Sequence, residues 1–195
     1  MQIVLLFIGA YLLGSISFSY MITKGMKKGD IRKLGSGNAG ATNTLRVIGV
    51  GPAICVLLLD GLKGMIPVWA ALAMQYNMTA AIAAGAMSII GHNWPVYYGF
   101  KGGKGVATTI GVFVVASFIP ALIAGFFVIL IIAATRFVSL GSIVFMILTP
   151  VLMFILKTIP TEAALCASLI GVLSIWRHRT NISRLLKGNE RKIGH

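Results

Sequence analysis

Two glycine-rich segments of the sequence carry residue types that bind phosphate. The first, GSGNAGATNTLR, runs from Gly35 to Arg46, and the second, GFKGGKGVAT, runs from Gly99 to Thr108. Glycines let backbone N–H groups approach an anion, and a helix that starts after such a loop adds the positive end of its dipole. Both segments therefore predict anion binding at the beginning of a helix.

The two segments offer different groups to an anion. The first combines neutral donors with the planar fork of an arginine, which suits phosphate oxygens. Its candidate ligands are Ser36, Asn38, Thr42, Asn43 and Arg46. The second frames a lysine with glycines just before an apolar run, and these residues are Gly102, Gly103, Lys104 and Gly105. It lacks the GxxxxGKS/T spacing of nucleotide-binding loops, and for either segment alone an ordinary basic turn between helices is the alternative.

A third polar segment, RHRTNISRLLKGNERK, follows the last apolar run from Arg177 to Lys192. It contains the candidate site residues His178, Asn181 and Glu190, of which the glutamate is expected to orient basic groups rather than to react. From Arg184 onward the alternative is an amphipathic segment on anionic lipid. Arg191 and Lys192 are assigned to that role.

Three further ionisable residues lie in or next to apolar runs. His92 precedes a Trp-Pro pair and is either a substrate ligand or a helix-capping residue bonded to a backbone carbonyl. Asp60 and Lys63 lie inside an apolar run, where ionisable groups are costly and are usually paired or functional. Because the i, i+3 spacing places them on one helix face, we expect them to pair and to brace the helices near the site.

The elements that must hold these segments are membrane helices. The chain is 57% hydrophobic and only 11% charged, outside the usual range of soluble proteins. Since a spanning helix needs about 20 apolar residues, the 195 residues hold several spans and leave no room for a soluble catalytic domain. The net charge of +13 is divided among the segments between apolar runs, which argues against a nucleic-acid partner. Cys55 and Cys166 lie singly in apolar runs, and no metal site is predicted.

The apolar runs predict seven membrane-spanning helices in one domain, residues 1–195. The expected spans are 2–23, 47–74, 78–98, 106–118, 119–135, 140–156 and 161–176. The first run has no preceding basic residue and is too long for a cleaved signal peptide, so we expect it to be retained. The run from Val106 to Thr135 could be one tilted helix or two short helices broken at Pro120.

The basic residues decide between these alternatives, because lysine and arginine accumulate in cytoplasmic loops. With two helices, one side of the membrane receives fifteen of the seventeen basic residues, the other receives Lys157, and Lys63 lies inside a span. With one helix, the basic residues would be divided almost evenly. The sequence therefore predicts an all-α, seven-helix transmembrane bundle with the N-terminus outside and the C-terminus in the cytoplasm. All three polar segments then share the cytoplasmic face.

Together and in this order, GSGNAGATN, GHNWPVYYGFKGGKGVAT and RHRTNISRLLKGNE resemble the three motifs of the bacterial acyl-phosphate glycerol-3-phosphate acyltransferases, the PlsY family. The resemblance covers essentially the whole chain. It implies an enzyme of the bacterial cytoplasmic (inner) membrane, with its active site on the cytoplasmic side, that performs the first acylation of phospholipid synthesis. The implied reaction moves an acyl chain from acyl phosphate to the 1-hydroxyl of glycerol 3-phosphate, giving lysophosphatidic acid and phosphate. Around Trp94, Tyr97 and Tyr98 the chain is more aromatic than the family pattern.

The resemblance also implies roles for the candidate residues. Lys104 and the 102–105 backbone would hold one phosphate, Ser36, Thr42 and Arg46 another, and the sequence leaves open which phosphate each takes. His178 and Asn181 would lie by the attacked carbonyl, with either His178 or a substrate phosphate taking the proton. Because acyl phosphate is already activated, we expect direct transfer without a covalent intermediate, metal or cofactor.

Two other functions are compatible with parts of the sequence. A transporter for small phosphorylated solutes would also use basic groups and helix ends, but beyond Asp60 and Lys63 the spans offer few polar residues. A structural membrane subunit would leave the three motifs unexplained. The HxxxxD motif of acyltransferases that use acyl-CoA or acyl carrier protein is not present, since Tyr97 and Ser183 stand five residues after the two internal histidines. Expected partners are the two substrates, membrane lipid and the upstream enzyme that forms acyl phosphate.

Overall fold

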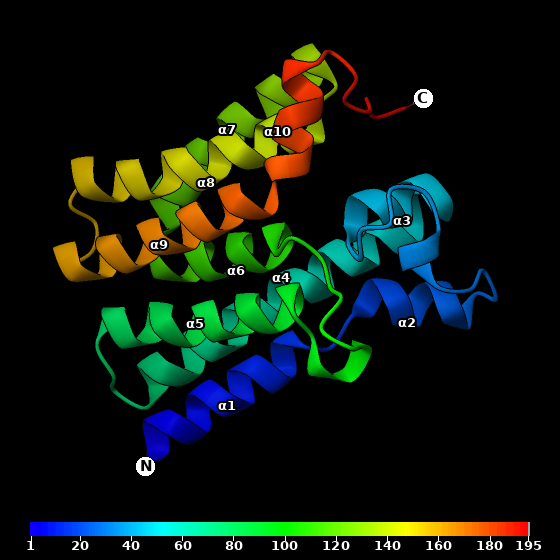
Figure 1. Cartoon of the computed structure of the whole chain (residues 1–195). Helices are drawn as coiled ribbons and strands as arrows, with labels where there is room; N and C mark the ends of the chain where they lie inside the picture. Colours follow the sequence, from blue (N-terminus) through cyan, green and yellow to red (C-terminus); the bar gives the residue numbers. More distant parts are fainter. Residues whose placement is uncertain (195) are drawn as a thin grey trace. The chain divides into compact units, whose positions relative to one another are not determined.

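The computed structural model describes residues 1–194 and is helical throughout its regular structure (Figure 1). The chain forms two compact units, Met1–Val115 and the residues from Ala116 onward. The predicted all-α class is therefore confirmed for the described residues. The assignment of residues 1–195 to a single domain stays a prediction.

The first unit contains three long helices, a fourth that ends at its boundary, and several short elements. Its helices are α1 (Gln2–Gly14), α2 (Phe18–Gly25), η1 (Ile31–Lys33), α3 (Ala41–Val47), α4 (Val50–Ala73), α5 (Met78–Asn93), η2 (Val96–Tyr98) and α6 (Val106–Ala116). Helix α5 packs against both α1 and α4. A Cβ at Gly14 would overlap the backbone of Ser88 on α5, and one at Gly64 would overlap the backbone of Thr108 on α6. Small residues thus allow close packing of these apolar helices.

The first predicted span is not one continuous helix. Residues 2–23 form α1 and α2, separated at Ser15–Ser17, where Ser17 has extended backbone angles. The break leaves the carbonyl of Ile16 without a helical partner, and the buried Nζ of Lys63 donates to it at 2.7 Å. An unsatisfied backbone carbonyl is costly away from water. Lys63 therefore stabilises a break that was not predicted, although Ser15 and Ser17 interrupt the apolar run there.

Two more predicted boundaries move because of glycine and proline. The span predicted from residue 47 begins at Val50, since Gly49 has a φ of +111° and separates α4 from the short helix α3. The span predicted to reach Tyr98 ends at Asn93, because Pro95 disfavours helical angles at Trp94. Both changes shorten a membrane helix and lengthen the polar segment beside it.

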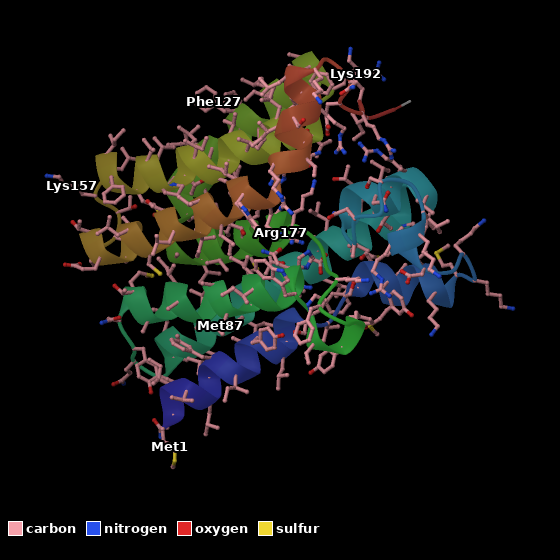
Figure 2. The ribbon with its side chains drawn as sticks, viewed as in Figure 1. Met1, Met87, Phe127, Lys157, Arg177 and Lys192 are labelled. Carbon is pink, nitrogen blue, oxygen red and sulfur yellow. The ribbon has the colours of Figure 1, made fainter. Side chains whose placement is uncertain are left out.

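The second unit contains α7 (Phe118–Thr135), α8 (Val138–Ile155), α9 (Thr161–Arg177) and α10 (Arg179–Leu186). Helix α7 packs on α8 and α8 on α9. Lys157, at the α8–α9 turn, lies at the opposite end of this unit from Arg177 and Lys192 (Figure 2). The predicted spans 140–156 and 161–176 match α8 and α9 within two residues at each end. Helix α10 lies in a segment for which no helix was predicted.

The run from Val106 to Thr135 is broken, as predicted, but at Ser117 rather than at Pro120. Pro120 lies in the first turn of α7, where a backbone N–H has no acceptor within the helix, so a proline is tolerated there. Ser117 is extended, and its hydroxyl hydrogen bonds with that of Thr158 at 2.6 Å. The start of α7 is thus tied to the α8–α9 turn.

Among the described residues, four segments are long and apolar enough to cross a membrane: Gln2–Gly25, which includes the break after α1, Val50–Ala73, Phe118–Thr135 and Val138–Ile155. Helix α7 exposes apolar side chains, among them Phe127 at 46% and Ile129 at 68% (Figure 2). A surface of this kind is suited to lipid. Helices α5, α6 and α9 are shorter, with 16, 11 and 17 residues.

Candidate active site

The first glycine segment is folded around a buried asparagine. The Oδ1 of Asn43 accepts a hydrogen bond from the Ser36 N–H at 2.8 Å, and its Nδ2 donates to the carbonyls of Ile31 and Leu34 at 3.2 and 3.0 Å. Gly35 lies beside this amide with a φ of +56°, and a Cβ there would overlap Oδ1. Asn43 therefore shapes the loop from inside, and a direct contact with substrate stays a prediction.

The other predicted ligands of this segment lie on the loop and on α3. Ser36 is exposed and Asn38 half-buried, both on the loop, whereas Thr42 and Arg46 are half-buried on α3. A helix does begin directly after the loop, as predicted, with Gly40 in the N-cap position. That helix is the seven-residue α3 and not the long span α4, so Thr42 and Arg46 are helical residues rather than loop residues.

The second glycine segment lies against the C-terminal end of α5. The Gly103 N–H donates to the carbonyl of His92 at 3.1 Å. A Cβ at Gly102 would overlap the same carbonyl, and a Cβ at Gly105, where φ is +75°, would lie 2.9 Å from a methyl carbon of Ile89. These glycines are therefore required for close approach as well as for backbone conformation. The loop presents Lys104, half-buried, one residue before Gly105 and the predicted start of α6 at Val106.

The two glycine segments meet at Gly103. A Cβ on Gly103 would overlap the Nε2 of His92 on one side and the carbonyl oxygen of Ala39 on the other. Ala39 belongs to the first segment and is itself buried. The structure thus brings together two segments that are more than sixty residues apart in the sequence. Ser36 and Lys104, three residues and one residue from this junction, belong to the same region of the first unit.

The predicted pair of Asp60 and Lys63 forms and extends to His92. The Oδ1 of Asp60 lies 2.7 Å from the Nζ of Lys63 and 3.6 Å from the Nδ1 of His92. All three side chains are buried. His92 therefore lies between the Asp60 carboxylate on α4 and the Gly103 backbone. The position of the glycine loop thus depends on how α4 and α5 pack. The pairing is confirmed, whereas a substrate contact of His92 stays a prediction.

In the second unit, His178 lies at the junction of α9 and α10. Its side chain is buried, and its Nδ1 lies 2.7 Å from the carbonyl oxygen of Ser174. Because a carbonyl oxygen can only accept, Nδ1 carries the proton in this contact. In the neutral ring the atom able to accept a proton is then Nε2, which is the arrangement that a general base requires.

Glu190 gathers three donors from two helices of the second unit. Its Oε1 accepts from the Nδ2 of Asn181 at 2.6 Å and from the hydroxyl of Ser139 at 2.9 Å, and its Oε2 accepts from the Nε of Arg184 at 2.7 Å. The side chain is only 4% exposed. Burial raises the pKa of Glu190, but the hydrogen bonds from Arg184, Asn181 and Ser139 outweigh it and hold the pKa below its ordinary value. The carboxylate thus fixes the orientation of Asn181.

Replacing Glu190 by glutamine is expected to destabilise the protein by about 2 kcal/mol at neutral pH, since hydrogen bonds to charged groups contribute roughly 1.5–3 kcal/mol. Because the folded-state pKa is lowered, the stabilisation is present above the ordinary value of 4.5 and is lost as pH falls through the folded value. Thermal unfolding of both proteins in detergent at pH 7 and pH 4 should therefore show a difference that shrinks in acid. The matched control is Glu162→Gln, at an exposed position, which should leave the stability unchanged. A Glu190→Gln protein as stable as the wild type at pH 7 would show that the hydrogen bonds of Glu190 do not stabilise the fold.

Comparison with known proteins shows the family of the chain. The sequence profile described as glycerol-3-phosphate acyltransferase matches residues 4–188. The chain belongs to the glycerol-3-phosphate acyltransferase family. The glycerol-3-phosphate acyltransferase of Shouchella clausii is 56% identical over 190 residues, which cover 94% of this chain and 92% of that protein. The relative from Halalkalibacterium halodurans is also 56% identical, over 197 residues that cover 97% and 95% of the two chains.

Solved structures of the family extend the agreement to three dimensions. A crystal structure of PlsY (YgiH), an integral membrane glycerol 3-phosphate acyltransferase, in its glycerol 3-phosphate form has a TM-score of 0.94 and 41% identity to this chain. The comparison covers 100% of this chain and 96% of that one. The lysophosphatidic acid form of PlsY has a TM-score of 0.91 with the same coverage. The predicted resemblance is confirmed, and the fold is that of an integral membrane acyltransferase.

Several residues that organise the site in this family member were not singled out from the sequence. Arg32 bonds to Asp30 and to the carbonyl of Tyr98, next to the two glycine segments. Ser139 donates to Glu190 from α8. The Asp30-x-Arg32 spacing directly before Gly35 is a local signal that an ion pair could form, but Ser139 has no such signal, because its partner lies 51 residues away.

Proposed function

We propose that the protein transfers an acyl chain from acyl phosphate to the 1-hydroxyl of glycerol 3-phosphate, giving lysophosphatidic acid and inorganic phosphate in the first acylation of phospholipid synthesis. The observation that carries the proposal is the junction of the two glycine segments at Ala39 and Gly103, beside Ser36 and Lys104. Both substrates carry a phosphate, and this junction offers backbone N–H groups and a lysine to hold one. Family membership and the glycerol 3-phosphate form of the solved relative support the same acceptor.

The two glycine segments divide the phosphate binding. Lys104 and the 102–105 backbone hold one phosphate, and Ser36, Thr42 and Arg46 hold the other. The Gly103 N–H donates to the His92 carbonyl, so in this proposal the phosphate is held by the other N–H groups of residues 102–105 and by the positive charge of Lys104. In the first segment, Asn43 holds the Ser36 backbone N–H, and the Ser36 side chain is exposed, where a ligand can reach its hydroxyl.

The transfer is a direct attack on an activated carbonyl. The hydroxyl oxygen of glycerol 3-phosphate forms the new ester bond to the acyl carbon, the bond from that carbon to the phosphate oxygen breaks, and inorganic phosphate leaves. The mixed anhydride is already activated, so positioning and stabilisation of the developing charge supply the catalysis. Asn181, oriented by Glu190, is assigned to the carbonyl, and His178 is assigned to the hydroxyl proton through its Nε2.

The membrane arrangement proposed is seven spans with the N-terminus outside and the active site on the cytoplasmic face of the inner membrane. The Ile193 N–H donates to the carbonyl of Arg136 at 2.9 Å, so the basic α7–α8 corner and the C-terminal segment lie at one end of the second unit. Ser117 and Thr158 meet at 2.6 Å near Lys157. Both contacts support a topology in which Arg136 and the C-terminal segment lie on one side of the membrane and Lys157 lies on the other.

Helix α6 is the shortest of the seven proposed spans. Its 11 residues extend about 16 Å at 1.5 Å per residue, and it packs against both α4 and α5.

The proposal is tested with the purified full-length protein in detergent or lipid, palmitoyl phosphate and glycerol 3-phosphate. Equal amounts of phosphate and lysophosphatidic acid are expected, and both should depend on glycerol 3-phosphate. No product with either preparation would overturn the enzyme assignment. Flux of glycerol 3-phosphate into proteoliposomes without acyl transfer would instead support the transporter hypothesis, which family membership does not favour.

A further inference from the structure

Arg32 joins the two glycine segments at the points where they begin. Its Nε and Nη2 donate to the carboxylate of Asp30 at 2.8–3.1 Å, and its Nη1 donates to the carbonyl of Tyr98 at 2.8 Å. Arg32 lies on η1, three residues before Gly35, and Tyr98 ends η2, directly before Gly99. One guanidinium thus binds the residues that precede both phosphate-binding segments.

An aromatic pair completes this contact. The ring of Tyr20, on α2, lies 5.2 Å from the guanidinium carbon of Arg32, within the range of a cation–π interaction. The same ring packs on Tyr98 with 4.8 Å between the ring centroids. The Arg32 clasp, defined as Tyr20, Asp30, Arg32 and Tyr98, therefore connects α2, η1 and η2. Four residues into each of the same two segments, Gly103 lies against the carbonyl of Ala39.

The clasp requires the planar fork of an arginine. Only a guanidinium can bind a carboxylate through two parallel N–H groups, donate to a third acceptor and stack on a ring at once, whereas a lysine ammonium has one donor centre. The hydrogen bonds from Arg32 hold the pKa of Asp30 below its ordinary value, against the effect of burial, which raises it. The Asp30 carboxylate is therefore ionised throughout the neutral range, and the clasp is constant rather than pH-switched.

We infer that Arg32 is a positioning residue that sets the distance between the phosphate-binding groups of the two glycine segments. This inference rests on the proposed function, because it assigns the spacing to the recognition of glycerol 3-phosphate. The clasp bonds to the backbone just before each segment, and the segments also meet four residues in, at Ala39 and Gly103. Without the clasp the segments keep the Ala39–Gly103 contact but lose the connection before Gly35 and Gly99, so the separation of Ser36 and Lys104 is less well fixed.

The test compares Arg32→Lys with wild type in initial-rate kinetics. The substitution keeps the positive charge and removes the fork, so the KM for glycerol 3-phosphate should rise about tenfold with kcat changed by less than about threefold, as expected for lost uniform binding. Lys33→Ala, which removes a neighbouring exposed charge without touching the clasp, should keep the wild-type KM. An unchanged KM in Arg32→Lys overturns the inference, and so does an equal rise in Lys33→Ala, because general charge would then explain the effect.

Two further measurements keep the inference separate from folding and from the proposed function. If Arg32→Lys is not recovered as a folded protein, Tyr20→Leu, which removes only the stacked ring, decides: a rise in KM is expected, and a wild-type KM overturns the inference. Calorimetric titration of the same proteins with glycerol 3-phosphate gives the comparison without turnover. Wild-type protein that binds but does not react with palmitoyl phosphate overturns the proposed reaction, while the ratio of Kd values still tests Arg32.

Discussion

Replacing His178 by glutamine is expected to lower kcat by about 10²- to 10⁴-fold, the usual contribution of a positioned general base. The contact between Nδ1 and the Ser174 carbonyl holds the ring in one orientation and leaves Nε2 as the proton acceptor. A glutamine side chain retains a donor for that carbonyl but cannot accept the hydroxyl proton. The rate of phosphate release at saturating palmitoyl phosphate and glycerol 3-phosphate measures the effect.

The matched control for His178→Gln is His92→Gln. Both histidines are buried, but His92 contacts Asp60 and the Gly103 backbone. Its replacement should therefore raise the KM for glycerol 3-phosphate more than it lowers kcat. Thermal unfolding of both variants separates a catalytic loss from a folding defect. A folded His178→Gln protein with nearly wild-type kcat would exclude His178 as the essential base, leaving a substrate phosphate to take the proton.

The helical class and most of the helices were predictable because lipid imposes a strong, local constraint on composition. Apolar runs located α7, α8 and α9 within two residues. The division of α1 from α2 was not predicted: serines are tolerated in membrane helices, so Ser15 and Ser17 alone do not indicate a break. The group that satisfies the Ile16 carbonyl lies 47 residues away on α4. The shift from Pro120 to Ser117 has a local cause, because a proline in the first turn does not break a helix.

The residue types of the candidate site could be predicted from the sequence, but the partners that these side chains contact could be predicted less well. The glycines at 102 and 103 indicated a loop that something approaches closely, and in the structure His92, Pro95 and Ala39 lie where their Cβ atoms would be. A contact of the loop backbone with phosphate stays a prediction. Asn43 was predicted as a donor to substrate; in the structure its Nδ2 donates to the carbonyls of Ile31 and Leu34, and a contact with substrate stays a prediction. Residue type indicates that a group can donate. Only the fold decides to which acceptor it donates.

Gly103→Ala is expected to lower kcat/KM by about 100-fold, the scale of loss that a displacement of about 1 Å can produce at an active site. A methyl group there would overlap the His92 ring and the Ala39 carbonyl, and its third neighbour, the His92 Cδ2, would lie at 3.0 Å. Neither the backbone nor a ring held by Asp60 can give way easily, so the two glycine segments must separate. Lys104 follows directly in the chain and would move with them.

The matched control for this substitution is Gly51→Ala on α4. Nothing lies within 4 Å of a Cβ at Gly51, and its φ is not positive. Alanine in a helix is favoured over glycine by roughly 0.5–1 kcal/mol, so this control should be at least as stable and as active as wild type. If Gly103→Ala retains kcat/KM within threefold of the control, the junction of the two segments does not set the geometry of catalysis. If it loses activity while its thermal unfolding stays close to that of wild type, the defect lies in the placement of Lys104 and Ser36 rather than in the fold.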